Sequence, residues 1–168
     1  MISEKIGNIA SLKIEFFDEP EESFEVTELG RYSYSMKRVS DGSAIDFDTL
    51  RILNLLTSFS DVRFEAFLDD VAPQRRDSII KSPCLEKITL RTKDGKGEVI
   101  ATHPLKINAD AFGFVEDDWD FDPDHKYAYV ENSNDLVMIQ DFVFGKILKP
   151  ASYYEKGNVE PLQMIHYQ

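Results

Sequence analysis

The stretch EDDWDFDPDH, residues 116–125, holds the side chains whose types and spacing could most readily do chemistry. Six carboxylates occupy the nine positions 116–124, and two aromatic residues, Trp119 and Phe121, lie between them. Carboxylates this close repel one another unless something compensates their charge. The pattern allows three interpretations: a metal site, a pair of catalytic acids, or a loop held by its aromatic side chains.

A calcium-binding loop has a specific ligand spacing with which this segment can be compared. Asp120, Asp122 and Asp124 match the first three ligand positions of a helix–loop–helix calcium loop, and Glu131 falls at the twelfth. However, His125 occupies the turn position that requires glycine, and a proline lies inside the loop. A looser site for calcium or magnesium is the alternative, and its candidate ligands are Asp118, Asp120, Asp122 and Asp124.

A solvated acidic loop or edge strand explains more of the segment. Trp119 and Phe121 are two residues apart, so an extended chain points both side chains to one face. The intervening carboxylates then point into solvent, and His125 and Lys126 relieve part of their repulsion. We therefore expect Trp119 to be at least partly buried and to anchor the loop.

Catalytic interpretations have little support. Six acids in a wet loop give no reason for one of them to have the raised pKa of a general acid. Cys84 lies in no catalytic motif, His103 lies at the end of a predicted strand, and KDGKG is typical of a hairpin turn. We expect a protein without enzymatic activity, with a carboxylate-based hydrolase as part of the alternative.

Composition restricts the partners. The chain has 168 residues, 42% of them hydrophobic, which is typical of one globular domain. Its 19 Lys and Arg stand against 31 Asp and Glu, a net charge of −12, which argues against nucleic acid and against an anionic membrane surface. No apolar run is long enough to insert into a membrane. A protein partner with a basic surface is compatible with this negative charge.

Periodicity predicts a similar order of elements in the two halves of the chain. Alternating apolar residues predict strands over 9–17, 23–29, 31–37, 85–92, 97–104 and 126–131. Apolar residues three and four apart predict a helix over 46–59, with Leu53 and Leu56 in the core. A second helix is predicted after cap candidates Ser133 and Asn134, with the stripe Leu136, Ile139, Val143 and Ile147.

These elements predict an α+β fold. We expect one globular domain over 1–168, with two sequential β-β-β-α units, 9–59 and 85–148, joined by a connector, 60–84. The sheet is expected to be mainly antiparallel, with one amphipathic helix packed on each unit. The repeat rests on the order of elements, since no residue identities support a duplication.

Two long segments carry a family resemblance. DFDPDHKYAYVENSNDLVMIQDFVFGKILKPASYY (120–154) and PQRRDSIIKSPCLEKITLRTKDGKG (73–97) resemble parts of a bacterial family known as domain of unknown function 4340. The family shows an acidic D-x-D segment before a "YA" strand, a D-L-V-x-I-Q segment and an aromatic "SYY" end. The resemblance extends from about residue 9 to residue 154.

The resemblance implies a location rather than a reaction. Members are commonly held at the cell envelope by an N-terminal membrane segment, and some accompany exporter-type transport components. This chain shows no such segment, so a cytoplasmic location stays open beside an extracytoplasmic one. We therefore expect a non-catalytic, soluble interaction module of an envelope-associated protein; the alternative is a divalent-metal-binding protein or hydrolase that uses residues 116–124.

Overall fold

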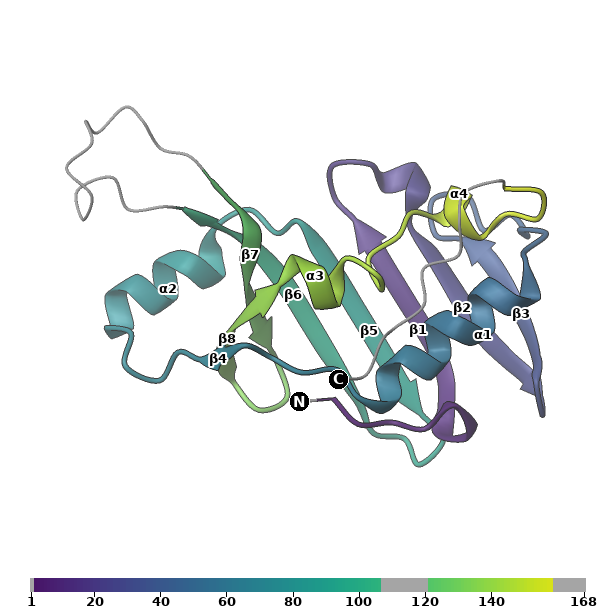
Figure 1. Ribbon diagram of the computed structural model, residues 1–168, viewed down its shortest axis with the longest axis horizontal. Helices are drawn as coiled ribbons and strands as arrows, with labels where there is room; N and C mark the ends of the chain where they lie inside the picture. Colours follow the sequence, from purple (N-terminus) through teal and green to yellow (C-terminus); the bar gives the residue numbers. More distant parts are fainter. Residues whose placement is uncertain (1, 107–120, 159–168) are drawn as a thin grey trace.

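The computed structural model describes residues 2–106 and 121–158 (Figure 1). Eight strands form one sheet, every neighbouring pair is antiparallel, and the order is β3-β2-β1-β5-β6-β7-β8-β4. The strands are β1 Ile9–Phe16, β2 Phe24–Gly30, β3 Ser33–Arg38, β4 Ala66–Phe67, β5 Glu86–Thr92, β6 Gly97–Lys106, β7 Phe121–Val130 and β8 Asp135–Gln140. The predicted α+β class and antiparallel sheet are confirmed.

Helices are few and short. The α-helices are α1 Thr49–Thr57, α2 Pro73–Lys81, α3 Asp141–Phe144 and α4 Ala151–Tyr154, and 3₁₀ turns cover Ile6–Asn8, Pro20–Glu22 and Ser58–Ser60. Within residues 2–106 and 121–158, no helix combines the length and the apolar character that crossing a membrane requires.

Strand alternation buries one face of β1 and its neighbours. Leu12 and Ile14 are fully buried, whereas Lys13 and Glu15 between and beyond them point to the opposite face. Ile14 pairs across the sheet with Ile88, so the two halves of the chain share one apolar layer. Polar residues on the opposite face can remain in water, as is usual for antiparallel sheets.

Helix α1 forms where periodicity predicted it. Asp48 is the N-cap, and its carboxylate accepts hydrogen bonds from the backbone N–H groups of Leu50, at 3.0 Å, and Arg51, at 3.3 Å. Leu56 is buried as predicted, but Leu53 is only half-buried. The buried apolar side of this helix therefore runs through Ile52, Leu55 and Leu56.

The helix predicted after Ser133 is wrong. Residues Asp135–Gln140 form strand β8, and only Asp141–Phe144 are helical. Asn134 has a positive φ of 56° and its N–H bonds to the Glu131 carbonyl at 3.3 Å, so it belongs to the β7–β8 hairpin turn and caps no helix. Leu136, Val137 and Ile139 are all buried because both faces of β8 are covered, and this removes the alternation that would mark a strand.

The helices lie on both faces of the sheet. Helix α1 and the segment carrying α3 and α4 cross one face (Figure 1). Helix α2 contacts Tyr127, whose hydroxyl is 3.4 Å from the Arg75 guanidinium, and Tyr127 points away from its core neighbour Ala128. Two β-β-β-α units are thus not confirmed, because four strands precede α3 in the second half.

Candidate functional site

The structure describes part of the acidic segment. Asp122 and Asp124 lie at the start of β7, whereas Asp118, Asp120 and Trp119 lie outside the described residues. Strand β7 begins at Phe121, but its pairing with β8 begins only at His125. Among residues 121–124, Phe121 pairs with Lys106 on β6, and no residue pairs with β8. The expected acidic loop or edge strand therefore stays a prediction for this segment.

The described acids lie in a bulge of β7. Pro104 pairs with Lys126 and Lys106 pairs with Phe121, so residues 122–125 stand opposite Leu105 alone. Asp122 Oδ1 accepts a hydrogen bond from the Asp124 N–H at 2.8 Å, which closes a local turn. The proline between these two acids fits a bulge because it needs no backbone partner for an N–H group.

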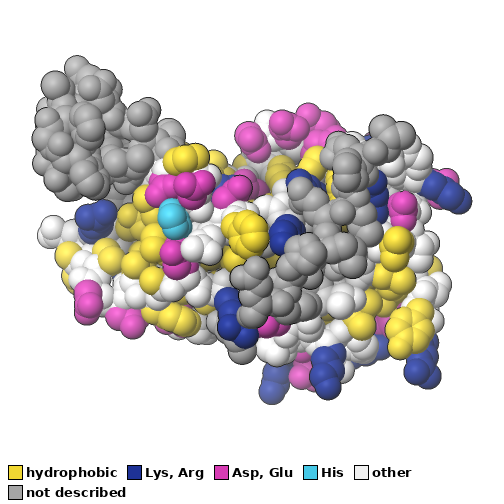
Figure 2. Space-filling view, in the orientation of Figure 1, with side chains coloured by type: hydrophobic (Ala, Val, Ile, Leu, Met, Phe, Trp, Pro, Cys, Tyr) yellow, Lys and Arg dark blue, Asp and Glu magenta, His cyan; other side chains and the backbone are white. Residues whose placement is uncertain are grey.

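The bulge brings His125 between two carboxylates. His125 Nδ1 is 3.0 Å from Asp122 Oδ2, and its Nε2 is 2.8 Å from Glu65 Oε2. Gln140 on β8 donates to the other oxygen of Glu65 at 2.9 Å. We call Glu65, Asp122, His125 and Gln140 the His125 cluster. Acidic side chains also gather around a histidine on the face shown in Figure 2.

The charges of this cluster favour an imidazolium. Partial burial lowers the pKa of His125, but the hydrogen bond that its ring donates to Asp122 and the charges of Asp122, Glu65 and Asp124 outweigh it and hold that pKa above its ordinary value. Desolvation raises the pKa of Asp122, yet hydrogen bonds from Asp124 and His125 bring it below normal. In the protonated form that these charges favour, both nitrogens donate, and that form has no lone pair for a metal or for proton abstraction.

The predicted metal site remains a prediction. Among the residues that the structure describes, no group of three or more His, Cys, Asp or Glu side chains is placed to hold a metal ion. Asp122 uses both carboxylate oxygens within the bulge. Two of the four proposed ligands, Asp118 and Asp120, lie outside the described residues.

Sequence analysis missed a buried acid on β5 that pairs with a half-buried lysine on β7. Glu86 is only 8% exposed, accepts a hydrogen bond from the Thr102 hydroxyl at 2.9 Å, and meets Lys126 Nζ at 3.1 Å. Its position in the alternation with Ile88 and Leu90 was the available signal, because that alternation points all three side chains to the core. With these partners, Glu86 is a satisfied structural charge.

His103 and Ser82 form no nucleophile–base pair. His103 Nδ1 is 3.1 Å from the Ser82 carbonyl oxygen, which can only accept, so this nitrogen carries the proton. The Ser82 hydroxyl donates instead to the Ile79 carbonyl at 2.5 Å. Nearby, burial raises the pKa of the Cys84 thiol, which disfavours a reactive thiolate.

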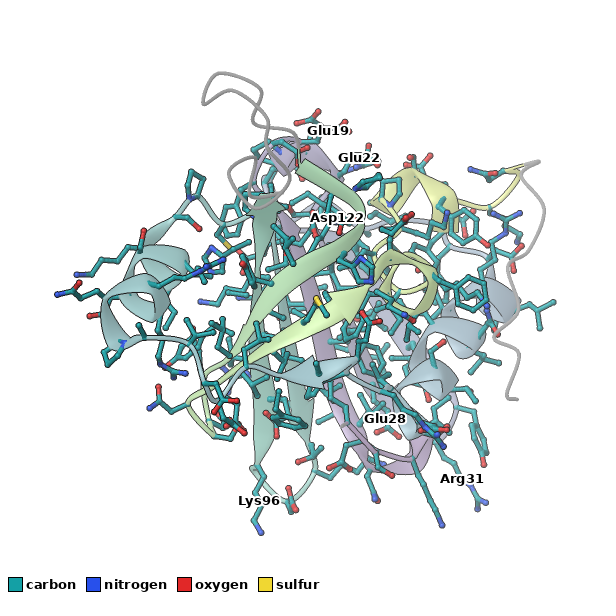
Figure 3. The ribbon with its side chains drawn as sticks, turned by 60° about the vertical axis from the view of Figure 1, so that its left-hand side comes forward. Glu19, Glu22, Glu28, Arg31, Lys96 and Asp122 are labelled. Atoms are coloured by element: carbon teal, nitrogen blue, oxygen red, sulfur yellow. The ribbon has the colours of Figure 1, made fainter. Side chains whose placement is uncertain are left out.

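A second acidic segment converges on the bulge. The β1–β2 turn carries Glu19 and Glu22 at the same end of the sheet as Asp122, whereas Arg31 and Lys96 mark the other end (Figure 3). Glu22 is engaged with the Ser152 backbone and hydroxyl, and Asp122 is half-buried. The exposed acids at this end are Asp18, Glu19, Glu21 and Asp124. We define the acidic end as Asp18, Glu19, Glu21, Asp122 and Asp124.

Comparisons of the chain with protein-family models, curated proteins and solved structures found no match. The resemblance to domain of unknown function 4340 therefore stays a prediction, and function must be argued from the geometry of the site.

Proposed function

We propose that this chain is a non-catalytic protein-binding module whose acidic end docks on a Lys- and Arg-rich surface of a partner protein. One observation carries the proposal: the fold brings the β1–β2 turn and the β7 bulge, about a hundred residues apart in the chain, to one end of the sheet (Figure 3). Asp18, Glu19 and Glu21 form no ion pair with any Lys or Arg in residues 2–106 and 121–158.

The physics of exposed carboxylates suits this role. Such groups keep most of their hydration when a partner approaches, so they contribute through long-range attraction and orientation. Lys13, Lys37 and Lys87 are already beside Glu15, Glu25 and Glu131 on the open sheet face, which leaves the acidic end as a concentrated source of negative potential. Binding should therefore weaken as salt is added.

We further propose an envelope-associated role outside the cytoplasm, and the family resemblance alone supports this location. The alternative, a divalent-cation site or a hydrolase built on residues 116–124, gains no support from the described acids. Asp122 is engaged with Asp124 and His125, and the two ring nitrogens of His125 each lie beside a carboxylate.

Binding of a fluorescent Lys-rich peptide tests the proposal directly. Asp18→Asn, Glu19→Gln and Glu21→Gln combined should raise the Kd about tenfold, equivalent to about 1.4 kcal/mol. Asp69→Asn, Asp70→Asn and Asp77→Asn make the same change in net charge at exposed positions elsewhere. This control should change the Kd by less than about twofold. An equal loss of affinity in both variants would show that net charge alone drives the binding, and it would contradict the proposed docking site.

A further inference from the structure

The two edges of the sheet are protected to different extents. Strand β4 forms one edge and is only two residues long, whereas six-residue β3 forms the other. A returning segment covers the C-terminal half of β3. There the Arg38 N–H donates to the Ser43 carbonyl at 2.9 Å, and the Met36 carbonyl accepts from the N–H of Ile45 at 2.8 Å. Within residues 2–106 and 121–158, the half of β3 before Met36 has no such neighbour on its outer side.

The backbone of Tyr34 is the open part of this edge. Successive residues of an antiparallel strand direct their backbone groups to alternate sides. Because the N–H of Arg38 and the carbonyl of Met36 point away from β2, the N–H and the carbonyl of Tyr34 also point away from it. No backbone hydrogen bond from another segment of the described chain reaches these two groups. A free donor and a free acceptor on an extended edge strand are a template for one more strand.

Apolar side chains lie beside this open edge. Tyr32 and Leu50 are each 62% exposed, and Tyr34 and Leu53 are half-buried. Helix α1, which carries both leucines, follows directly on the segment that covers the C-terminal half of β3. Hydrophobic side chains gather over this helix on the right of the face shown in Figure 2. We call Tyr32, Tyr34, Leu50 and Leu53 the apolar strip, and it can cover the apolar side chains of an added strand.

The other side of the same edge is polar and carries cations. Strand alternation places Ser33, Ser35 and Lys37 on the sheet face opposite the core. Lys37 is exposed, 3.5 Å from Glu25, and Arg31 in the β2–β3 turn is exposed as well. A carboxylate on an added strand, opposite Ser33 or Ser35, lies diagonal to one of these two cations and within reach of its long side chain. The edge therefore favours apolar side chains on one side of a partner strand and acidic side chains on the other.

We propose that the β3 edge binds an extended segment of a partner protein in which apolar and acidic side chains alternate. The backbone of this segment pairs antiparallel with Tyr34, its apolar side chains lie against the apolar strip, and its carboxylates meet Arg31 and Lys37. A second copy of this chain fits less well, because antiparallel pairing centred on Tyr34 brings Arg31 of one copy toward Lys37 of the other. The surface shares no residue with the acidic end, and it selects a partner of the opposite charge.

Titration with the peptide Val-Glu-Val-Glu-Val-Glu-Val, acetylated and amidated at its ends, tests the proposal through the amide resonance of Tyr34. Saturable binding is expected. Tyr34→Pro should weaken it by about tenfold or more, because proline removes the outward N–H and leaves the pairing with β2 intact. Tyr34→Ala keeps that N–H and should lose less affinity. Leu50→Ala should weaken binding by about threefold, whereas Phe142→Ala, which trims a 72% exposed side chain on α3, should not.

The peptide provides a second measurement that does not depend on the folding of a variant. In an antiparallel pair, the residue opposite Tyr34 lies on the same face and exchanges both hydrogen bonds with it, so the valine amides of the peptide face β3. N-methylation of the valine amides should abolish binding, and N-methylation of the glutamate amides should not. Glutamine in place of glutamate should weaken binding by about threefold or more.

Four results would overturn the proposal. They are no binding of the peptide, equal losses from the two methylation patterns, equal affinity for the glutamine peptide, and a dimer in sedimentation velocity that Tyr34→Pro dissociates. The last result would identify a second copy of the chain as the occupant of the edge.

Discussion

At the residue scale, His125 shows how much a site depends on distant partners. The sequence places it beside Asp122 and Asp124, and relief of their repulsion was predicted from that spacing. Its other partners, Glu65 and Gln140, are remote in the chain and meet it only because β4 pairs with β8 and β8 pairs with β7. No local pattern predicts this arrangement, because register between strands is set by the whole sheet.

The raised pKa of His125 predicts a pH-dependent contribution to stability. Its imidazolium is stabilised in the folded state, so the contribution is complete below the unfolded pKa of about 6.5 and is lost as pH rises through the higher folded pKa. His125→Gln should therefore destabilise the protein by less than about 1 kcal/mol near pH 6 and have a smaller effect near pH 9. Urea unfolding across this pH range measures the difference.

Glu65→Gln is the control for this pH effect. In that background the effect of His125→Gln on the free energy of unfolding should shrink, because one of the two carboxylates that hold the ring is gone. At low pH the Asp122 carboxylate makes the opposite contribution. Because its pKa is lowered in the folded state, the carboxylate stabilises the fold at pH values above its unfolded pKa, and this stabilisation is lost as pH falls through the folded pKa. A His125→Gln effect that is equal at every pH would contradict the proposed charge state.

Gly97 provides a second prediction at this scale. A Cβ atom at this position would lie 2.1 Å from the Leu90 carbonyl oxygen, a backbone atom that cannot move without disturbing the β5–β6 pair. Gly97→Ala should lower the free energy of unfolding by about 1–3 kcal/mol, measured by thermal melting. Gly7→Ala, where no atom lies within 4 Å of the added carbon, should change it little; equal effects would refute the close-approach argument.

At the element scale, most strands and helix α1 could be predicted because one face of each is buried and the other is wet. The prediction failed at β8, where Leu136, Val137 and Ile139 are buried together and their spacing also fits a helical stripe. The hairpin turn at Asn134 could not be told from a helix cap by residue type, since Asn favours both.

Helix α1 gives a test of which stripe packs on the sheet. Leu55 is 1% exposed and Leu50 is 62% exposed, although both are leucines of the same helix. Leu55→Ala should reduce the free energy of unfolding by about 2–5 kcal/mol, because it leaves a cavity in the core. Leu50→Ala should change it by less than about 0.5 kcal/mol. Similar losses in urea unfolding would show that the helix is rotated from the described orientation.

At the scale of the whole molecule, the acidic end could be predicted only in part. The acids of residues 18–22 and 116–124 are plain in the sequence. The convergence of residues 18–22 with Asp122 and Asp124 follows from β1 ending and β7 beginning at the same end of the sheet, and periodicity within each strand does not contain this information about strand order.

The shared sheet predicts that the two halves of the chain unfold together. Strand β1 pairs with β5 along its length, and Phe24 on β2 packs against Tyr154 on α4 with ring centroids 5.2 Å apart. Because each half buries its apolar face against the other, fragments 1–60 and 82–168 should each fail to fold alone. The whole chain should unfold in one transition, with far-UV circular dichroism and tryptophan fluorescence giving the same midpoint in urea. Separate midpoints, or a fragment with protected amides, would show instead two units that fold independently.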